Sequence, residues 1–191
     1  MAGRIVVEMA CSVTRIGVDG DGTSVGEGAR REGVGWRVAL VVSRYNGWVT
    51  GKLEEGALGA LERLSGGRGE AVVVGVSGSL EVPALVAEAA SGGGFDAVVA
   101  LGCVIKGETE HDRHIGAAII GNLVEIGSAS GVPIGVGILT VNDAAQAEAR
   151  AGGNLGNKGA EAMEAALASA AGIGELRGLR GGVVSGGGSR G

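Results

Sequence analysis

The chain has 191 residues, enough for one globular domain with a sizeable core and too few for two domains of ordinary size. Its net charge of −5 argues against nucleic acid or an anionic membrane surface as the main partner. Aromatic residues make up only 2% of a chain that is 45% hydrophobic, so the core must consist mainly of Val, Ala, Leu and Ile.

Apolar runs alternate with amphipathic segments between two Gly-rich ends. In chain order, strands are expected at 36–42, 71–76, 96–101 and 134–139, and helices at 49–64, 83–90, 111–127, 143–150 and 159–171. The strand runs are short and almost wholly apolar, as strands covered on both faces should be. The alternation predicts an α/β domain with a four-stranded parallel sheet and helices on both faces.

The two ends of the chain differ in composition from the part between them. Residues 1–35 are expected to be an N-terminal extension and residues 178–191 a Gly-rich flexible tail, which leaves 36–177 as the folded domain. In an open parallel sheet, ligands bind beyond the carboxyl ends of the strands. That rule selects four loops for a site, at 43–47, 77–81, 102–110 and 140–143.

The first two of these loops carry polar groups suited to a planar heterocycle. Tyr45, the only tyrosine, could stack on a ring while Asn46 offers an amide donor and acceptor. Alternatively, Tyr45 covers apolar surface at a helix-entry turn. Glu81 lies between Leu80 and Val82. Its carboxylate either accepts hydrogen bonds from the N–H groups of a pyrimidine or stabilises the start of the following helix electrostatically.

The third loop is the richest in chemistry. Thr109 and the amides around Gly107 and Glu108 open onto a predicted helix N-terminus, where anions bind readily. His111 begins that helix, and imidazole, with an unperturbed pKa of about 6.5, suits proton transfer near neutrality. His111 and His114 could also share a helix face as metal ligands, but no further Cys or His completes a zinc site.

A Gly/Asn-rich loop at 151–157 is flanked by Arg150 and Lys158. Glycines let the backbone approach an anion and Arg can bind phosphate bidentately. Alternatively, Arg150 is only the cation favoured at a helix C-terminus, followed by a flexible turn. No Gly-x-Gly-x-x-Gly follows the first expected strand, so a dinucleotide site has no support, and no P-loop motif is present either.

Several features favour the cytoplasm. Cys11 and Cys103 lie far apart and are expected to be free thiols in a reducing compartment. No apolar run approaches the roughly 18 residues of a membrane span. The first residues lack a signal-peptide pattern, and acidic residues within 1–35 make a plastid transit peptide the less favoured alternative.

Five motifs in this order resemble those of the 6,7-dimethyl-8-ribityllumazine synthase family. They are SRYN at 43–46, GSLEVP at 78–83, GCVIKGETEH at 102–111, GILT at 137–140 and RAGGNLGNKG at 150–159. The resemblance spans roughly residues 36–171 and implies a three-layer flavodoxin-like fold. It also implies a transferase without a cofactor, which condenses 5-amino-6-(D-ribitylamino)uracil with 3,4-dihydroxy-2-butanone 4-phosphate in the penultimate step of riboflavin biosynthesis.

The resemblance assigns each motif a role. Tyr45 stacks on the pyrimidine next to Asn46, and the remaining residues on the ring and ribityl side are Ser79, Leu80, Glu81, Cys103, Val104 and Ile105. On the phosphate side, His111 shuttles protons, and the expected contacts are Lys106, Glu108, Thr109, Arg150 and Lys158. A neighbouring subunit is expected to supply Val136, Arg150 and Lys158.

The family assembles as pentamers, decamers or 60-subunit shells, so a homopentamer-based assembly is expected, with riboflavin synthase as a possible partner.

The chain departs from the family at Leu80 and Val136, where aromatic residues are frequent, which predicts a looser ring pocket. Asp112, Arg113 and His114 also replace a common Phe, acid and aromatic. The alternatives are an inactive shell-forming homologue and another phosphosugar-binding enzyme on the same fold.

Overall fold

The computed structural model describes residues 12–17, 35–108 and 111–183. The strands are β1 (Ser12–Gly17), β2 (Arg37–Ser43), β3 (Glu70–Val76), β4 (Ala97–Ile105), β5 (Ile134–Val141), β6 (Ala151–Gly153) and β7 (Gly156–Asn157). The α-helices are α1 (Gly47–Ser65), α2 (Val82–Ser91), α3 (His111–Ser130), α4 (Ala144–Arg150) and α5 (Lys158–Val183), and a 3₁₀ turn, η1, spans Ser79–Glu81.

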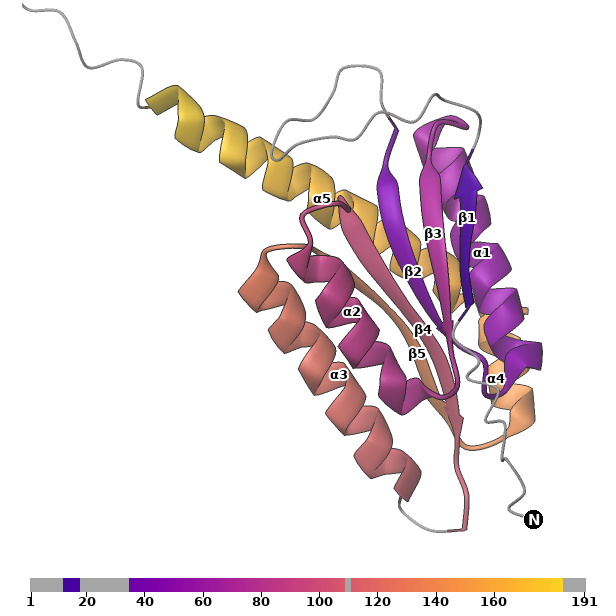
Figure 1. The fold of residues 1–191 in the computed structure, drawn as a ribbon. Coiled ribbons are helices and arrows are strands. Elements are labelled where there is room, and N and C mark those ends of the chain that lie inside the picture. The colour runs from indigo at the N-terminus through magenta and orange to yellow at the C-terminus, as the bar shows by residue number, and fades with distance from the viewer. Residues whose placement is uncertain (1–11, 18–34, 109–110, 184–191) are drawn as a thin grey trace, which may run out of the picture.

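A five-stranded sheet in the order β1-β3-β2-β4-β5 forms the centre of the fold (Figure 1). Strands β3, β2, β4 and β5 are parallel, which confirms the predicted four-stranded parallel sheet, and β1 adds an antiparallel edge strand beside β3. The composition of the chain places residues 12–17 in the N-terminal extension. Their β-branched residues Val13, Thr14 and Ile16 are the signal that favours a strand there.

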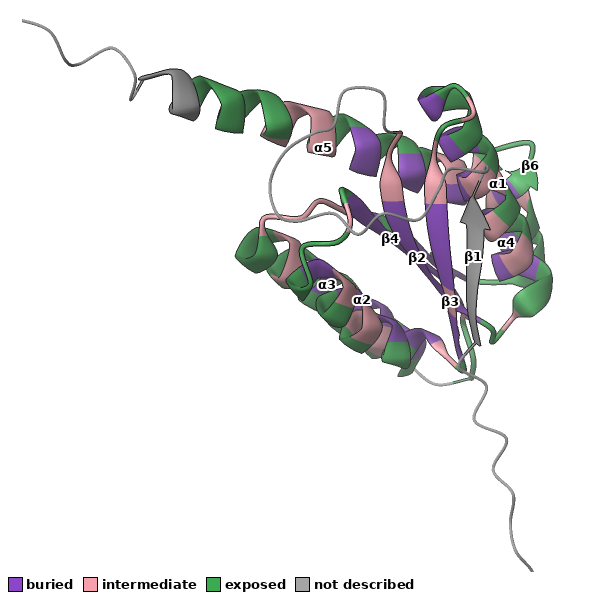
Figure 2. Cartoon of the chain, turned by 45° about the horizontal axis from the view of Figure 1, so that its top comes forward, coloured by how far each residue is buried: buried purple, intermediate pink, exposed green. Residues whose placement is uncertain are grey.

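Helices cover both faces of the sheet, so the molecule has the expected three layers (Figure 1). Alternate residues of each strand enter different cores. Val38, Leu40 and Val42 pack with α1 and α5, whereas Ala39 and Val41 pack with α2 and α3. The central strands are buried almost throughout (Figure 2), which explains why their sequences are continuously apolar.

Helix α5 is longer than the predicted 159–171 and continues into the segment that is expected to be a flexible tail. Gly172, Gly174 and Gly178 each disfavour a helix by roughly 1 kcal/mol, which is why the prediction stops early. The good helix formers between them continue the helix, and Arg177 Nη2 donates to the carbonyl of Gly131 at 3.1 Å. The rest of the predicted tail, 184–191, lies outside the described residues.

Glycine allows α5 to start directly against α1. A Cβ built on Gly159 would stand 1.9 Å from the carbonyl oxygen of Leu53, far inside van der Waals contact. Similarly, a Cβ on Gly135 would lie 2.3 Å from the carbonyl oxygen of Ala162, so α5 also lies close to β5. The high glycine content is therefore used in part for close backbone packing.

We expect Gly159→Ala to lower the free energy of unfolding by about 1–3 kcal/mol, because the added methyl must push α1 and α5 apart. Gly59→Ala is the matched control: it is also a helical glycine, but a Cβ placed there would have nothing within 4 Å. That substitution should be neutral or stabilise by up to about 1 kcal/mol. Denaturant unfolding of both variants measures the difference, and equal midpoints would contradict the close packing.

Candidate active site at the carboxyl edge of the sheet

Three hydrogen bonds join the four loops that follow the parallel strands. Asn46 Nδ2 donates to the carbonyl of Cys103 at 3.1 Å and connects the first loop with the end of β4. The Arg44 amide donates to the carbonyl of Val76 at 2.7 Å, and the Lys106 amide donates to the carbonyl of Val141 at 2.8 Å. The four segments selected from the sequence therefore lie along one edge of the sheet.

The first loop exposes its aromatic ring and fixes its amide. Tyr45 is 69% exposed at the turn before α1, so most of its ring is open to solvent. Asn46 has φ 56° and ψ 43°, a left-handed conformation that Asn tolerates better than most residues, and it precedes α1. Trp48, 45% exposed in the first turn of α1, is a second aromatic near this loop that the sequence patterns do not single out.

The second loop is formed by the 3₁₀ turn η1. Ser79 is buried, and its hydroxyl would lie 2.8 Å from a Cβ on Gly102, so it packs against β4. Leu80 is 55% exposed. The Glu81 carboxylate folds back toward Gly78, where an added Cβ would be 2.9 Å from Oε2. A hydrophobic side chain and a carboxylate thus stand at the edge of the sheet next to the third loop.

The third loop leads from β4 to the exposed His111 at the first position of α3. Val104 and Ile105 are half-buried, and Lys106 and Glu108 are exposed. Thr109, the expected phosphate contact, lies outside the described residues. Within the described residues, no group of three or more His, Cys, Asp or Glu side chains could hold a metal ion.

The Cys103 thiol does not face the loops. Its side chain is 1% exposed and packs in the core beside α1 and α5, so only its backbone carbonyl reaches Asn46. Burial raises the pKa of this thiol from 9.0 to about 11, because the thiolate is poorly solvated there. Any contribution of Cys103 to ligand binding therefore comes from its backbone.

We expect Cys103 to resist alkylation by iodoacetamide at pH 8 until the chain unfolds, since the thiolate is the nucleophile. Because the folded state holds this proton more tightly than the unfolded chain, the raised pKa stabilises the fold. This contribution is fully present below pH 9.0 and is lost as the pH rises through about 11. Mass spectrometry after timed alkylation, with and without denaturant, measures the reactivity. Cys11 lies outside the described residues, so Cys11→Ser provides the background for the assay.

Within one chain, the structure does not bring Val136, Arg150 or Lys158 to His111. Arg150 ends α4 and its Nη1 donates to the carbonyl of Gln146 at 3.2 Å, while Lys158 pairs with Glu161 at 2.5 Å. Helix α4 packs on the α1 side of the sheet through Ala147, whereas α3 covers the opposite face. Val136 is 38% exposed on the edge strand β5.

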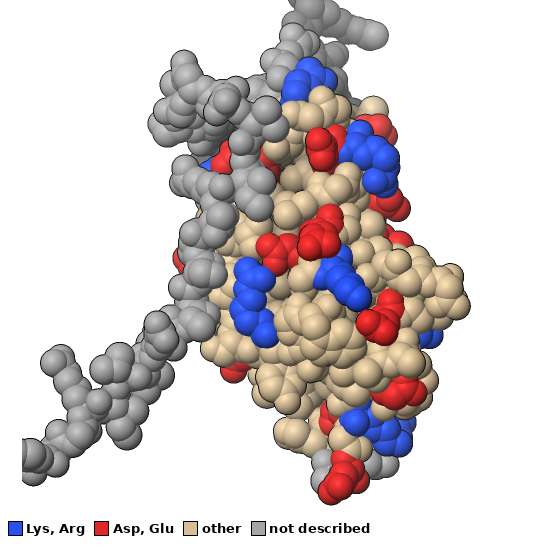
Figure 3. Space-filling view, turned by 90° about the vertical axis from the view of Figure 1, so that its right-hand side faces the viewer, with Lys and Arg blue, Asp and Glu red and all other residues tan. Residues whose placement is uncertain are grey.

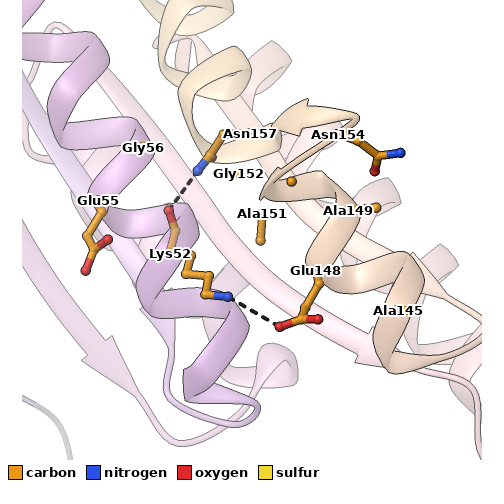
Figure 4. A pocket seen from close by; sticks show the side chains of 11 residues that line it. Lys52, Glu55, Gly56, Ala145, Glu148, Ala149, Ala151, Gly152, Asn154 and Asn157 are labelled. Carbon is orange, nitrogen blue, oxygen red and sulfur yellow. Dashed lines mark hydrogen bonds and ion pairs between the residues drawn. The ribbon is translucent and has the colours of Figure 1, made fainter.

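A groove of about 820 Å³ lies away from these four loops, between α1 and the segment of α4, β6 and β7 (Figure 4). An ion pair of 3.4 Å between Lys52 and Glu148 crosses it, and Asn157 Nδ2 donates to the carbonyl of Lys52 at 2.8 Å. The Gly/Asn-rich loop at 151–157 lines part of this groove, but none of the individual residues assigned to the site, Arg150 and Lys158 included, does so. Its size alone does not make it the reaction site, because the aromatic ring and the histidines are absent from it.

The surface on the α1 side carries both signs of charge. Acidic and basic groups are interspersed on it (Figure 3). Residues of α1 form two of the ion pairs, Arg44–Glu54 and Arg63–Glu164. Such a mixed surface offers no continuous basic area for a polyanion. Among the described helices, none has the length and apolar character needed to cross a bilayer.

The sequence profile of one protein family, described as 6,7-dimethyl-8-ribityllumazine synthase, matches residues 35–172. Two relatives, from two strains of Thermus thermophilus, carry the same description. Each is 44% identical to the chain over 133 residues, which cover 70% of this chain and 85% of the relative. The matched region contains every residue of the candidate site.

Proposed function

The chain belongs to the 6,7-dimethyl-8-ribityllumazine synthase family, and we propose that the loops at the carboxyl edge of its sheet form the active site of this transferase of riboflavin biosynthesis. The observation that carries the proposal is the family match over residues 35–172, which includes all four loops and the segment from Arg150 to Lys158. His111 is assigned the proton transfers.

The pyrimidine substrate is assigned to the first three loops. The exposed Tyr45 ring stacks on the heterocycle, and the bond from Asn46 Nδ2 to the carbonyl of Cys103 holds Asn46 at the same edge of the sheet. Glu81 accepts from the donor edge of the ring, and Ser79, Leu80, Val104 and Ile105 border the ring and ribityl chain. Leu80 offers apolar contact but no stacking face, which makes Tyr45 the principal aromatic partner.

The four-carbon phosphate substrate is assigned to the start of α3. Backbone amides near Lys106 and Glu108, together with Thr109, cradle the phosphate, and the positive end of the α3 dipole favours it. His111 takes a proton from the attacking amine as the imine forms and water leaves. It then takes a proton from the carbon next to the imine, and the electron pair left there expels the phosphate from the neighbouring carbon. The chain's own residues supply these steps, so no cofactor is invoked.

We assign Val136, Arg150 and Lys158 to the site of an adjacent subunit in a pentamer-based assembly. Support comes from the placement of α3 and α4 on opposite faces of one sheet, which separates His111 from Arg150 within a chain. Val136 stands half-exposed on an edge strand, where a neighbour can reach it. A location in the cytoplasm agrees with the free, buried thiol of Cys103. Transfer of the product to riboflavin synthase extends the same proposal.

The direct test mixes the purified protein with the two family substrates and follows lumazine absorbance and fluorescence. Product formation well above the uncatalysed rate is expected. A rate equal to the uncatalysed one, from protein that assembles normally, would favour the inactive shell-forming homologue. Turnover of a different phosphosugar without lumazine formation would favour another enzyme on the same fold.

A further inference from the structure

A second pocket lies beside the first turn of α3, next to the carboxyl end of β5. Its volume is about 300 Å³, at the small end of the range for ligand sites. It is lined by Lys106, Asp112, Arg113, Thr140, Val141 and Asn142. Thr140, Val141 and Asn142 belong to the fourth loop, but apart from Lys106 none of the lining residues is assigned a substrate contact in the proposed reaction site.

Asp112 is the unusual member of this pocket. Helix α3 lies close to β5 at Gly116, where an added Cβ would stand 2.7 Å from Thr140 Oγ1. Asp112 is one turn earlier on the same helix face, so it is pressed against the end of the strand. It is 7% exposed, and its Oδ1 atom is buried without a hydrogen-bond partner.

An unpaired buried carboxylate oxygen is costly, and folded proteins rarely leave one unless water, an ion or a ligand completes it. The charges and hydrogen-bonding groups of the lining residues indicate whether water, an ion or a ligand completes Asp112. Lys106 and Arg113 are cations that only donate hydrogen bonds, whereas the Asp112 carboxylate only accepts them. The three formal charges, two positive and one negative, leave a net charge of +1. A metal cation would satisfy Asp112 but would be repelled by the two basic groups.

A ligand that fits must therefore offer several acceptor oxygens and at least one donor. Hydrogen phosphate has both, because its P–OH group can donate to Asp112 while its other oxygens accept from Lys106 and Arg113. Sulfate carries the same charge at neutral pH but no proton. We propose that this pocket binds inorganic phosphate, as a site separate from that of the substrate phosphate near Glu108 and Arg150.

The biological role of this site rests on the proposed function, in which phosphate is a product. The pocket shares Lys106 with the third loop and begins one residue after His111, so phosphate released at the reaction site has a nearby pocket with two cationic side chains to move to. Occupation of this pocket clears the substrate phosphate subsite for the next molecule. Inorganic phosphate should accordingly inhibit turnover in two phases as its concentration rises, one for each phosphate site. Only the phase that belongs to this pocket should depend on Asp112.

The experiment measures phosphate binding by titration calorimetry on the full chain with Arg150→Ala, which weakens the substrate phosphate subsite. We expect one phosphate per chain to remain, with sulfate bound about ten- to a hundredfold more weakly, because a hydrogen bond to a charged group is lost. Asp112→Asn should abolish this preference, because the amide can donate to sulfate. Arg113→Gln should weaken both anions, whereas Arg68→Gln, an exposed arginine outside the pocket, should change neither.

Equal affinity for phosphate and sulfate, or no binding by the Arg150→Ala protein, would overturn the proposal and leave water as the partner of Asp112. If Asp112→Asn does not fold, Arg113→Gln still decides the matter, since Arg113 is exposed. The binding measurement does not need turnover. A protein that binds phosphate selectively but forms no lumazine would refute the proposed function and retain the site.

Discussion

Replacing His111 with Ala should lower kcat for lumazine formation by about two to four orders of magnitude, the usual contribution of a positioned general acid–base group. His111 is exposed at the first position of α3, so its removal leaves no cavity and should not change the thermal midpoint appreciably. KM for the two substrates should change much less than kcat, because the imidazole acts on protons that move in the transition state. Steady-state kinetics by lumazine absorbance measures both parameters.

His114→Ala is the matched control for this variant. It removes the same side chain, also exposed, from the same helix one turn later. Its kcat should stay within a few-fold of the unmodified enzyme. A comparable fall in both variants would indicate that they disturb the start of α3, and an unchanged kcat in His111→Ala would refute the proton-transfer role. Loss of assembly in His111→Ala would instead assign the residue a structural role.

The strand and helix order could be predicted from the sequence because each central strand is apolar on both faces. Val38 to Val42 alternate between two cores, so no polar residue interrupts the run. The β1 strand could not be recognised this way, since it is a short edge strand in which polar residues interrupt the apolar ones. The length of α5 is underestimated for a similar reason: propensity counts its glycines but not the hydrogen bond from Arg177 to Gly131.

The location of the candidate site was also predictable, but the orientation of its side chains was not. The rule for parallel sheets selects the loops that Asn46, Arg44 and Lys106 join by hydrogen bonds. Strand alternation decides that the Cys103 thiol enters the core, whereas the family resemblance assigns this residue a ligand contact. Asp112 stands out in the sequence as a departure from the family, but only the close approach of Gly116 to Thr140 explains its burial.

The position of Arg150 has a consequence for how the site is completed. Sites at the edge of a single sheet normally collect residues from loops of the same chain, yet Arg150 ends a helix that packs on the face opposite α3. Its guanidinium reaches back to the carbonyl of Gln146, a conformation that leaves donors for an external anion. In a closed ring, the same surface of every subunit meets a different surface of its neighbour, so one chain can supply what another lacks.

Mixing His111→Ala and Arg150→Ala subunits should therefore restore activity that neither variant has alone. If each site takes His111 from one chain and Arg150 from the next, random mixing in equal amounts makes about one site in four complete. Activity near a quarter of the unmodified enzyme is thus expected after the two variants are unfolded together and refolded. Arg150→Ala alone should raise KM for the phosphate substrate more than that for the pyrimidine, so the mixture, both parents and the unmodified enzyme are compared at a phosphate-substrate concentration well below that raised KM, where Arg150→Ala alone turns over little.

The mixing experiment separates shared from self-contained sites because no chain in the mixture carries both intact residues. A self-contained site would leave the mixture at the average of the two parents, however well the subunits exchange. Lys52→Ala is the control for the Arg150→Ala subunits of the mixture. It removes a cation that lies outside the proposed site, in the groove between α1 and α4. Mixed with His111→Ala, it should give about half of the unmodified activity, because every chain with an intact histidine can then form a complete site with either neighbour.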